Sequence, residues 1–93
     1  MSSADAAQIE RALREHVLAR YVVGTTEDAF SSDEDLLASA LVDSLGVLEI
    51  VSFVEDAFSV VVDDEDIVPD NFRSVRAMTR FVAAKRASSM VER

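Results

Sequence analysis

The chain has 93 residues, the size of one domain, and 49% of them are hydrophobic, which argues against a disordered tail and a separate substrate domain. It has no cysteine, so disulfides, thiolate metal sites and a cysteine nucleophile are excluded. The net charge of −9 disfavours nucleic acid and anionic membranes as partners. Because no apolar run could span a bilayer and residues 1–5 do not resemble a signal peptide, we expect a soluble, cytoplasmic protein.

The first predicted element is an amphipathic helix over residues 4 to about 21. Its apolar side chains recur at every fourth position: Ile9, Leu13, Val17 and Tyr21. Ser2, followed three residues later by Asp5, is typical of a capping box, and Gly24 marks the end of the helix. His16, the only histidine, lies within this helix, and we expect it on the surface or at the core boundary and not as a general base.

The next segment, residues 22–42, shows no helical or strand periodicity. Apolar anchors are spread along it: Phe30, Leu36, Leu37 and Leu41. Residues 32–35 are suited to cap a single helical turn. We therefore expect an ordered loop that is pinned to the core, with its acidic side chains on the surface.

The second helix is predicted over residues 44–58, with Asp43 as the N-cap. One side of this helix is apolar: Val47, Ile50, Val51, Val54 and Phe58. The other side is polar except for two leucines: Ser44, Leu45, Leu48, Glu49, Ser52, Glu55 and Asp56. Gly46 in the first turn is expected to weaken the helix by up to about 1 kcal/mol relative to alanine.

The remaining chain predicts a linker, a short helix and a long helix. Residues 60–62 form an extended linker, because three valines without a second strand cannot make a sheet. Residues 63–68 form one short helical turn before Pro69. A last helix starts at Ser74, and the chain from about Ala87 onward is expected to fray.

Together these elements predict an all-α, four-helix bundle with three longer helices and one short third helix. We expect one domain over residues 1–93, ordered from about 4 to 87. Its predicted core comprises Ile9, Leu13, Val17, Leu37, Val47, Ile50, Val54, Phe58, Phe72, Val75, Met78 and Val82.

Familiar catalytic and metal-binding patterns are not found. Residues 42–46 have only the second glycine of a hydrolase elbow and no strand before it, which excludes a serine hydrolase. Residues 63–66 lack the glycine and the final glutamate of an EF-hand loop, so no specific metal site is expected. What stands out is Ser44 beside the outward-facing Leu45 and Leu48 among acids, which is typical of a docking surface.

The charge is distributed unevenly along the chain. Between Tyr21 and Phe72 there are fourteen acids and no lysine or arginine, whereas the two ends hold all nine basic residues against four acids. This asymmetry favours a basic partner for the acidic centre. The alternative is an acidic surface that only keeps the protein soluble.

The start of the second helix carries a distinctive motif: Asp43-Ser44-Leu45, followed by Glu49, Glu55, Asp56 and Phe58. This pattern resembles the attachment motif of acyl carrier proteins, and the likeness in element order extends over nearly the whole chain. It implies that Ser44, flanked by Asp43 and Leu45, receives 4′-phosphopantetheine from coenzyme A. The thiol of that arm would carry acyl groups as thioesters, and the protein itself would not be an enzyme.

The same resemblance implies a partner-binding face. The matching positions are Leu45, Leu48, Glu49, Ser52, Glu55, Asp56, Asp64 and Glu65. The implied partners are a phosphopantetheinyl transferase and an acyltransferase, ketosynthase or adenylating enzyme with a basic docking face, which a monomeric carrier visits in turn.

Three functions stay open at this point. The first is an acyl carrier of a polyketide or fatty-acid type pathway, the second is an aminoacyl or peptidyl carrier serving an adenylating enzyme, and the third is an acidic interaction domain whose Asp-Ser-Leu is coincidental.

Overall fold

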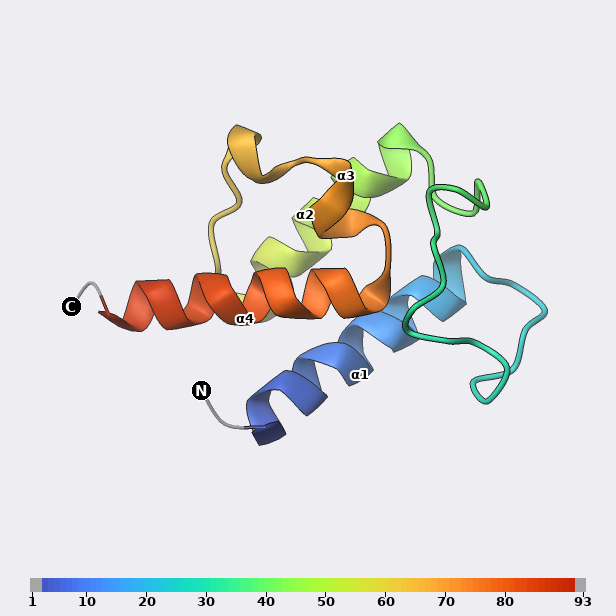
Figure 1. Cartoon of the computed structure of the whole chain (residues 1–93), viewed down its shortest axis with the longest axis horizontal. Coiled ribbons are helices and arrows are strands. Elements are labelled where there is room, and N and C mark those ends of the chain that lie inside the picture. The colour runs from blue at the N-terminus through green and yellow to red at the C-terminus, as the bar shows by residue number, and fades with distance from the viewer. Residues whose placement is uncertain (1–2, 92–93) are drawn as a thin grey trace.

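The computed structural model describes residues 3–91. Its helices, in chain order, are α1 (Ser3–Arg20), α2 (Ser44–Phe58), the 3-10 turn η1 (Asp64–Asp66), α3 (Pro69–Phe72) and α4 (Val75–Val91). No strand occurs within residues 3–91. The all-α fold class, with three long helices and a short third helix, is confirmed (Figure 1).

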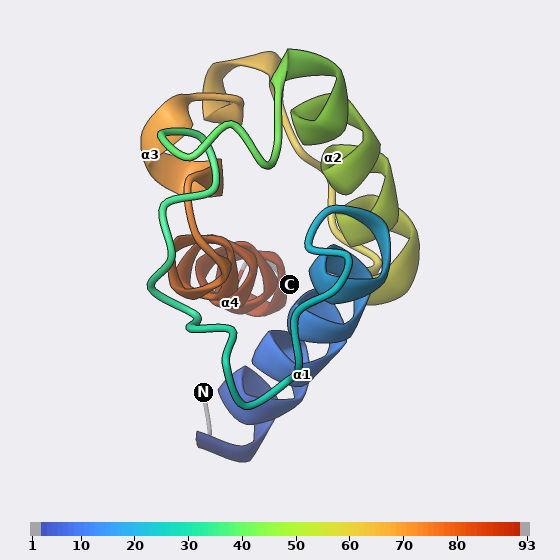
Figure 2. The ribbon, with the colours of Figure 1, turned by 90° about the vertical axis from the view of Figure 1, so that its right-hand side faces the viewer.

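The helices surround one apolar core, and α4 packs against the other three helices. Figure 2 looks at the molecule from the end where the loop between α1 and α2 crosses the bundle, passing α4 and α3 before it reaches α2. Most of the predicted core is buried: Ile9, Leu13, Val17, Ile50, Val54, Phe72, Val75, Met78 and Val82. Leu37, Val47 and Phe58 are half-buried and pack against it. Within residues 3–91, the buried large hydrophobic residues outside the predicted core set are Val22, Phe30, Leu36, Val42, Val51 and Val60.

The loop over residues 21–43 is ordered and pinned to the core, as predicted. The pin is Arg14 of α1, whose guanidinium donates to the backbone carbonyl oxygens of Phe30 at 2.6 Å and Glu27 at 2.8 Å, and to Ser32 Oγ at 2.9 Å. The guanidinium also lies over the Phe30 ring, 4.9 Å from its centroid. This contact was not predicted, because the apolar spacing of the helix does not show which loop atoms Arg14 reaches.

The segment between α2 and α4 differs from its prediction in one respect. The turn expected over residues 63–68 is η1, but the second short element, α3, begins at Pro69 itself. Proline suits the first position of a helix, because the backbone N–H that it lacks would have no partner there. From the sequence, Pro69 was taken only as the end of the preceding turn. The valine linker forms no strand, as predicted, and Val60 within it is buried.

The ends of α1 and α4 are only partly as predicted. The Oγ of Ser74 accepts a hydrogen bond from the backbone N–H of Ala77 at 3.0 Å, which caps α4 where its start was predicted. The helix then continues to Val91, beyond Ala87, where fraying was expected. Ser2, proposed as the capping residue of α1, lies outside the described residues. No helix within residues 3–91 is long and apolar enough to cross a membrane.

Candidate functional site

Ser44 is the first residue of α2, and its side chain is exposed. Asp43 precedes it in an extended conformation and caps the helix, because its Oδ1 accepts a hydrogen bond from the backbone N–H of Gly46 at 2.9 Å. This N-cap was predicted, and it confirms the start of the second helix at Ser44. The hydroxyl therefore lies at the positive end of a helix of 15 residues, where a negatively charged phosphate ester is favoured.

Gly46 has a packing role that the sequence analysis did not find. A Cβ at this position would lie 2.9 Å from Cγ1 of Val42 and 3.2 Å from Cε1 of Tyr21. Gly46 thus lets the end of α1 and the residue before the N-cap pack closely against the first turn of α2. Its low helix propensity remains a cost, but the close approach explains why alanine does not occupy this position.

An apolar cavity of about 520 Å³ lies beside Ser44. It is formed by the end of the first loop, the first turns of α2 and the segment that leads into α3. Its lining includes Val42, Val47, Leu48, Ile67, Val68 and Phe72, with Asp43 and Ser44 at the helix end. A group attached to the Ser44 hydroxyl would therefore have an apolar recess next to it.

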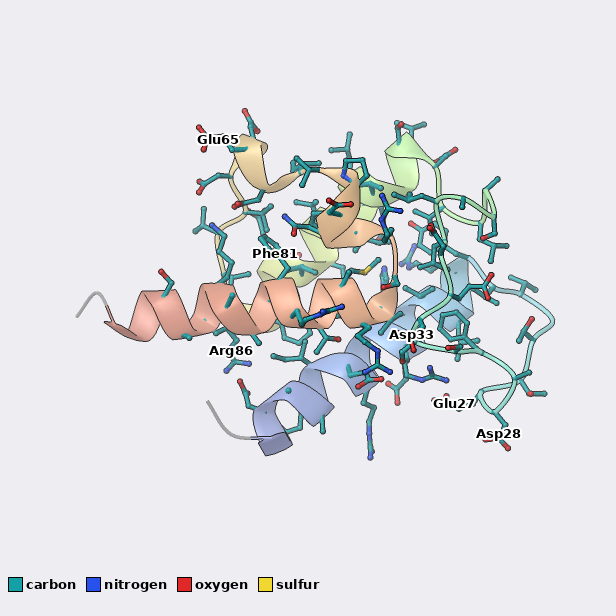
Figure 3. The ribbon with its side chains drawn as sticks, viewed as in Figure 1. Glu27, Asp28, Asp33, Glu65, Phe81 and Arg86 are labelled. Atoms are coloured by element: carbon teal, nitrogen blue, oxygen red, sulfur yellow. The ribbon has the colours of Figure 1, made fainter. Side chains whose placement is uncertain are left out.

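Most residues of the predicted partner face are exposed. Leu45 and Leu48 are 75% and 54% exposed, and Ser52 and Asp56 are exposed on the same helix. Asp64 and Glu65 are exposed on η1, and Figure 3 shows Glu65 pointing away from the body of the molecule. The structure therefore leaves these side chains accessible to another protein.

Glu49 is instead tied to α1. Its Oε1 accepts hydrogen bonds from the hydroxyl of Tyr21 at 2.5 Å and from Nε2 of His16 at 2.9 Å. Burial, the largest single effect, would raise the pKa of the Glu49 carboxyl, but the hydrogen bonds from Tyr21 and His16 together with the charges of His16 and Arg20 lower it overall. Burial and the bond to Glu49 raise the pKa of Tyr21 to about 12. Glu49 thus connects α2 to the C-terminal part of α1.

His16 sits at the core boundary, as predicted. Its ring stacks on Phe53 with 3.9 Å between centroids, and its hydrogen bond goes to Glu49 and not to Ser44. Glu55, the other inward acid, accepts a hydrogen bond from the backbone N–H of Val62 at 2.9 Å and so holds the linker after α2. From the sequence, both glutamates were placed on the outer face. Helical periodicity does not show which hydrogen-bond donors a neighbouring segment brings to a side chain.

Residues 16–82 match the family model described as the phosphopantetheine attachment site, which is more than half of the chain. The chain belongs to the phosphopantetheine-binding carrier protein family. A relative, aminoacyl carrier protein 2 of Bradyrhizobium diazoefficiens, is 36% identical over 59 residues, which cover 60% of this chain and 66% of that protein.

This carrier protein therefore holds a covalently attached 4′-phosphopantetheine. The residues around the start of α2 fit that group: an exposed hydroxyl, a capped helix end that favours a phosphate, and an apolar recess beside it. Carriers of this family interact with a phosphopantetheinyl transferase and with biosynthetic enzymes in general.

Part of the carrier's acidic excess is neutralised internally. Basic residues of the flanking helices pair with acids of the central segment: Arg14 with Glu27 at 3.0 Å, Arg76 with Asp33 at 2.5 Å, and Lys85 with Asp66 at 2.7 Å. The hydrogen bond from Lys85 lowers the pKa of Asp66. Among the described residues, no group of three or more histidine or acidic side chains is arranged to hold a metal ion.

Proposed function

We propose that Ser44 is the attachment residue and that the carrier shuttles acyl groups between biosynthetic enzymes. The observation that carries the proposal is the placement of Ser44: an exposed hydroxyl in Asp43-Ser44-Leu45, at the capped N-terminus of α2 and beside the apolar cavity. When bound, the phosphopantetheine arm supplies a thiol on which an acyl group is carried as a thioester.

In this proposal the carrier is a substrate of its transferase and not an enzyme. The Ser44 hydroxyl is the nucleophile, and within residues 3–91 it has no hydrogen bond to a basic side chain that could activate it. The transferase therefore supplies the activation. Asp43 fixes the start of α2 at Ser44 by capping Gly46, and Leu45 lies at the surface next to the attachment point.

The partner enzymes in this proposal are a phosphopantetheinyl transferase and an acyltransferase, ketosynthase or adenylating enzyme with a basic docking face. The face presented to them comprises Leu45, Leu48, Ser52, Asp56, Asp64 and Glu65, with Glu49 and Glu55 at its inner edge. A monomeric carrier suits successive binding of these enzymes, because each of them must reach Ser44 in turn. A cytoplasmic location belongs to the same proposal, since the arm is drawn from coenzyme A.

Two cargo classes are supported by different observations. The apolar lining of the cavity favours an aliphatic acyl chain, as in a polyketide or related pathway. The name of the Bradyrhizobium relative, an aminoacyl carrier protein, favours an amino acid as the second candidate cargo. Two loading experiments on the holo-protein distinguish these cargo classes. One uses an acyltransferase and the other uses adenylating enzymes with a set of amino acids, and the mass of the product identifies the cargo.

The test of the attachment residue is intact-protein mass spectrometry after incubation with coenzyme A, Mg²⁺ and a broad-specificity phosphopantetheinyl transferase. We expect one phosphopantetheine increment on the wild type and none on Ser44→Ala. Because Ser44 is exposed, the substitution should change the free energy of unfolding by no more than about 0.5 kcal/mol and leave the melting temperature nearly unchanged. Modification of Ser44→Ala, or an unmodified wild type with several unrelated transferases, would contradict the proposal.

A further inference from the structure

We propose that Lys85 of α4 is a positioning residue, which clamps η1 against α4 and so holds one wall of the cavity beside Ser44 in place. This inference deepens the proposed function and rests on it, because the cavity matters for a group that is attached at Ser44. Lys85 belongs to the last helix and does not itself line the cavity. Its effect on the site is therefore indirect and passes through residues 63–69.

The segment that follows η1 forms one wall of the cavity. Ile67, Val68 and Pro69 line it, together with residues of the first loop and of α2. Figure 3 shows Glu65, which belongs to η1, on the same side of α4 as Phe81. η1 itself contributes no buried residue, and Val68 is 41% exposed. Burial of apolar surface therefore stabilises η1 only weakly, and polar contacts determine whether it stays in place.

Lys85 supplies polar contacts that join η1 to α4. Its Nζ lies 2.7 Å from Oδ2 of Asp66, the last residue of η1, and 3.3 Å from Oδ2 of Asp63, the residue before it. The hydrogen bond between Lys85 and Asp66 raises the pKa of the lysine and lowers the pKa of the carboxyl, so both groups are charged at neutral pH. The Lys85 Nζ also lies 5.9 Å from the centroid of Phe81, whose ring packs on the cavity residue Phe72 with 5.5 Å between centroids. The Lys85 clamp, formed by Lys85 with Asp63 and Asp66, therefore joins η1 to an aromatic pair that reaches the cavity.

Hydrogen bonds within the segment connect the position of η1 to the cavity wall. The backbone carbonyl oxygen of Asp66 accepts from the backbone N–H of Val68 at 2.9 Å and from Nδ2 of Asn71 at 2.8 Å. Because Ile67 and Val68 follow Asp66 directly, a turn that is released from Lys85 moves these two lining side chains with it. Loss of the clamp should therefore make the cavity less enclosed and leave a group attached at Ser44 in more contact with water.

The first measurement is amide hydrogen exchange of the protein without its phosphopantetheine arm. Lys85→Met keeps the apolar stem of the side chain and removes the ammonium, and we expect it to speed exchange of the Ile67 and Asn71 amides about fivefold to tenfold. Lys85→Arg, which retains a donor for both carboxylates, should keep the wild-type rates. The matched control is Arg80→Met, because Arg80 is exposed on the same helix and has no hydrogen bond or ion pair within residues 3–91. It should also keep the wild-type rates.

The second measurement reports on the cavity. A broad-specificity transferase attaches to Ser44 a phosphopantetheine arm that ends in an apolar, environment-sensitive dye, supplied as its coenzyme A conjugate. In the wild type and in Lys85→Arg, we expect the dye emission to be blue-shifted relative to the free conjugate, because the dye contacts the apolar wall. In Lys85→Met and in Asp66→Asn the emission should shift back toward that of the free conjugate.

Two comparisons separate the clamp from a general loss of stability. Lys85→Met and Asp66→Asn remove the same ion pair, so the double variant should shift the emission little further than either single variant does. Arg14→Met disturbs the loop between α1 and α2, and in the folded protein it should leave the emission at the wild-type value.

The inference is overturned if Lys85→Met behaves like Arg80→Met in either measurement, or if the labelled wild type emits like the free conjugate. It is also overturned if Arg14→Met shifts the emission as much as Lys85→Met does. A wild type that is never labelled would instead contradict the proposed function, and hydrogen exchange, which needs no arm, would still decide whether Lys85 holds η1.

Discussion

Tyr21 and Gly46 show how much of the site depends on single side chains outside the Asp-Ser-Leu motif. Gly46 allows the Tyr21 ring to lie against the first turn of α2, and the Tyr21 hydroxyl then reaches Glu49. The sequence marked Tyr21 as the last apolar position of a helix and Glu49 as a surface acid. Neither residue type nor spacing indicates that the two side chains share a hydrogen bond, because the contact depends on the angle at which α1 meets α2.

The contact between Tyr21 and Glu49 can be tested by titration, since Tyr21 is the only tyrosine and the chain has no tryptophan. We expect phenolate absorbance to appear at about pH 12 in the folded protein and near pH 10 in urea. Because the pKa is raised in the folded state, the stability from this group is complete below about pH 10 and is lost as the pH rises toward 12.

Glu49→Gln serves as the control for this titration. Removal of the neighbouring negative charge should lower the folded-state midpoint, because both the hydrogen bond and the charge of Glu49 raise the pKa of Tyr21. Circular dichroism recorded on the same samples shows whether the helices persist. Phenolate formation near pH 10 in wild-type protein that has kept its helical signal would contradict the contact.

At the scale of the elements, the long amphipathic helices and the turn at η1 were predictable from the sequence, whereas the four-residue helix α3 was not. The second helix begins and ends where the sequence predicts, because Asp43 caps it and the apolar stripe ends at Phe58. The four-residue helix α3 has no periodicity to detect, and its position depends on contacts with α4. The loop between α1 and α2 was predicted from its apolar anchors, but the arginine that holds it belongs to a different element.

Arg14 is expected to determine whether that loop stays on the bundle. Arg14→Met removes hydrogen bonds to two backbone carbonyl oxygens and to Ser32, and it removes the ion pair with Glu27. We expect a loss of about 2 to 3 kcal/mol in the free energy of unfolding, measured by urea denaturation. Hydrogen exchange of the loop amides, such as that of Phe30, should also become faster.

Arg11→Met is the matched control for Arg14→Met. Arg11 lies on the exposed side of the same helix, and within residues 3–91 it has no hydrogen bond or ion pair. Its replacement should change the free energy of unfolding by less than about 0.5 kcal/mol. Equal effects of the two substitutions would mean that Arg14 does not pin the loop.

At the scale of the whole molecule, the fold pairs some of the acids in the central part of the sequence with basic residues from its two ends. The helices that carry the basic residues, α1 and α4, hold acids of the loop and of η1, as in the pairs of Arg76 with Asp33 and of Lys85 with Asp66. Figure 3 shows Asp28 at the far end of the loop and Glu65 at the opposite end of the molecule. Neither acid has an ion pair within residues 3–91, so uncompensated acids remain spread over the surface. The carrier keeps a formal net charge of −9.

Salt should therefore stabilise the carrier. Ion pairs in contact are screened little, whereas repulsion between acids on separate elements is screened strongly when the Debye length falls from about 30 Å at 0.01 M salt to about 10 Å at 0.1 M. If this relief reaches about 1 kcal/mol, the melting temperature measured by circular dichroism should rise by about 4 to 8 °C. Asp28→Asn with Glu34→Gln, two exposed acids of the loop, should raise the melting temperature at low salt and reduce the response to added salt. A melting temperature that falls as salt is added would show the reverse balance, with the internal ion pairs contributing more to stability than the repulsion subtracts.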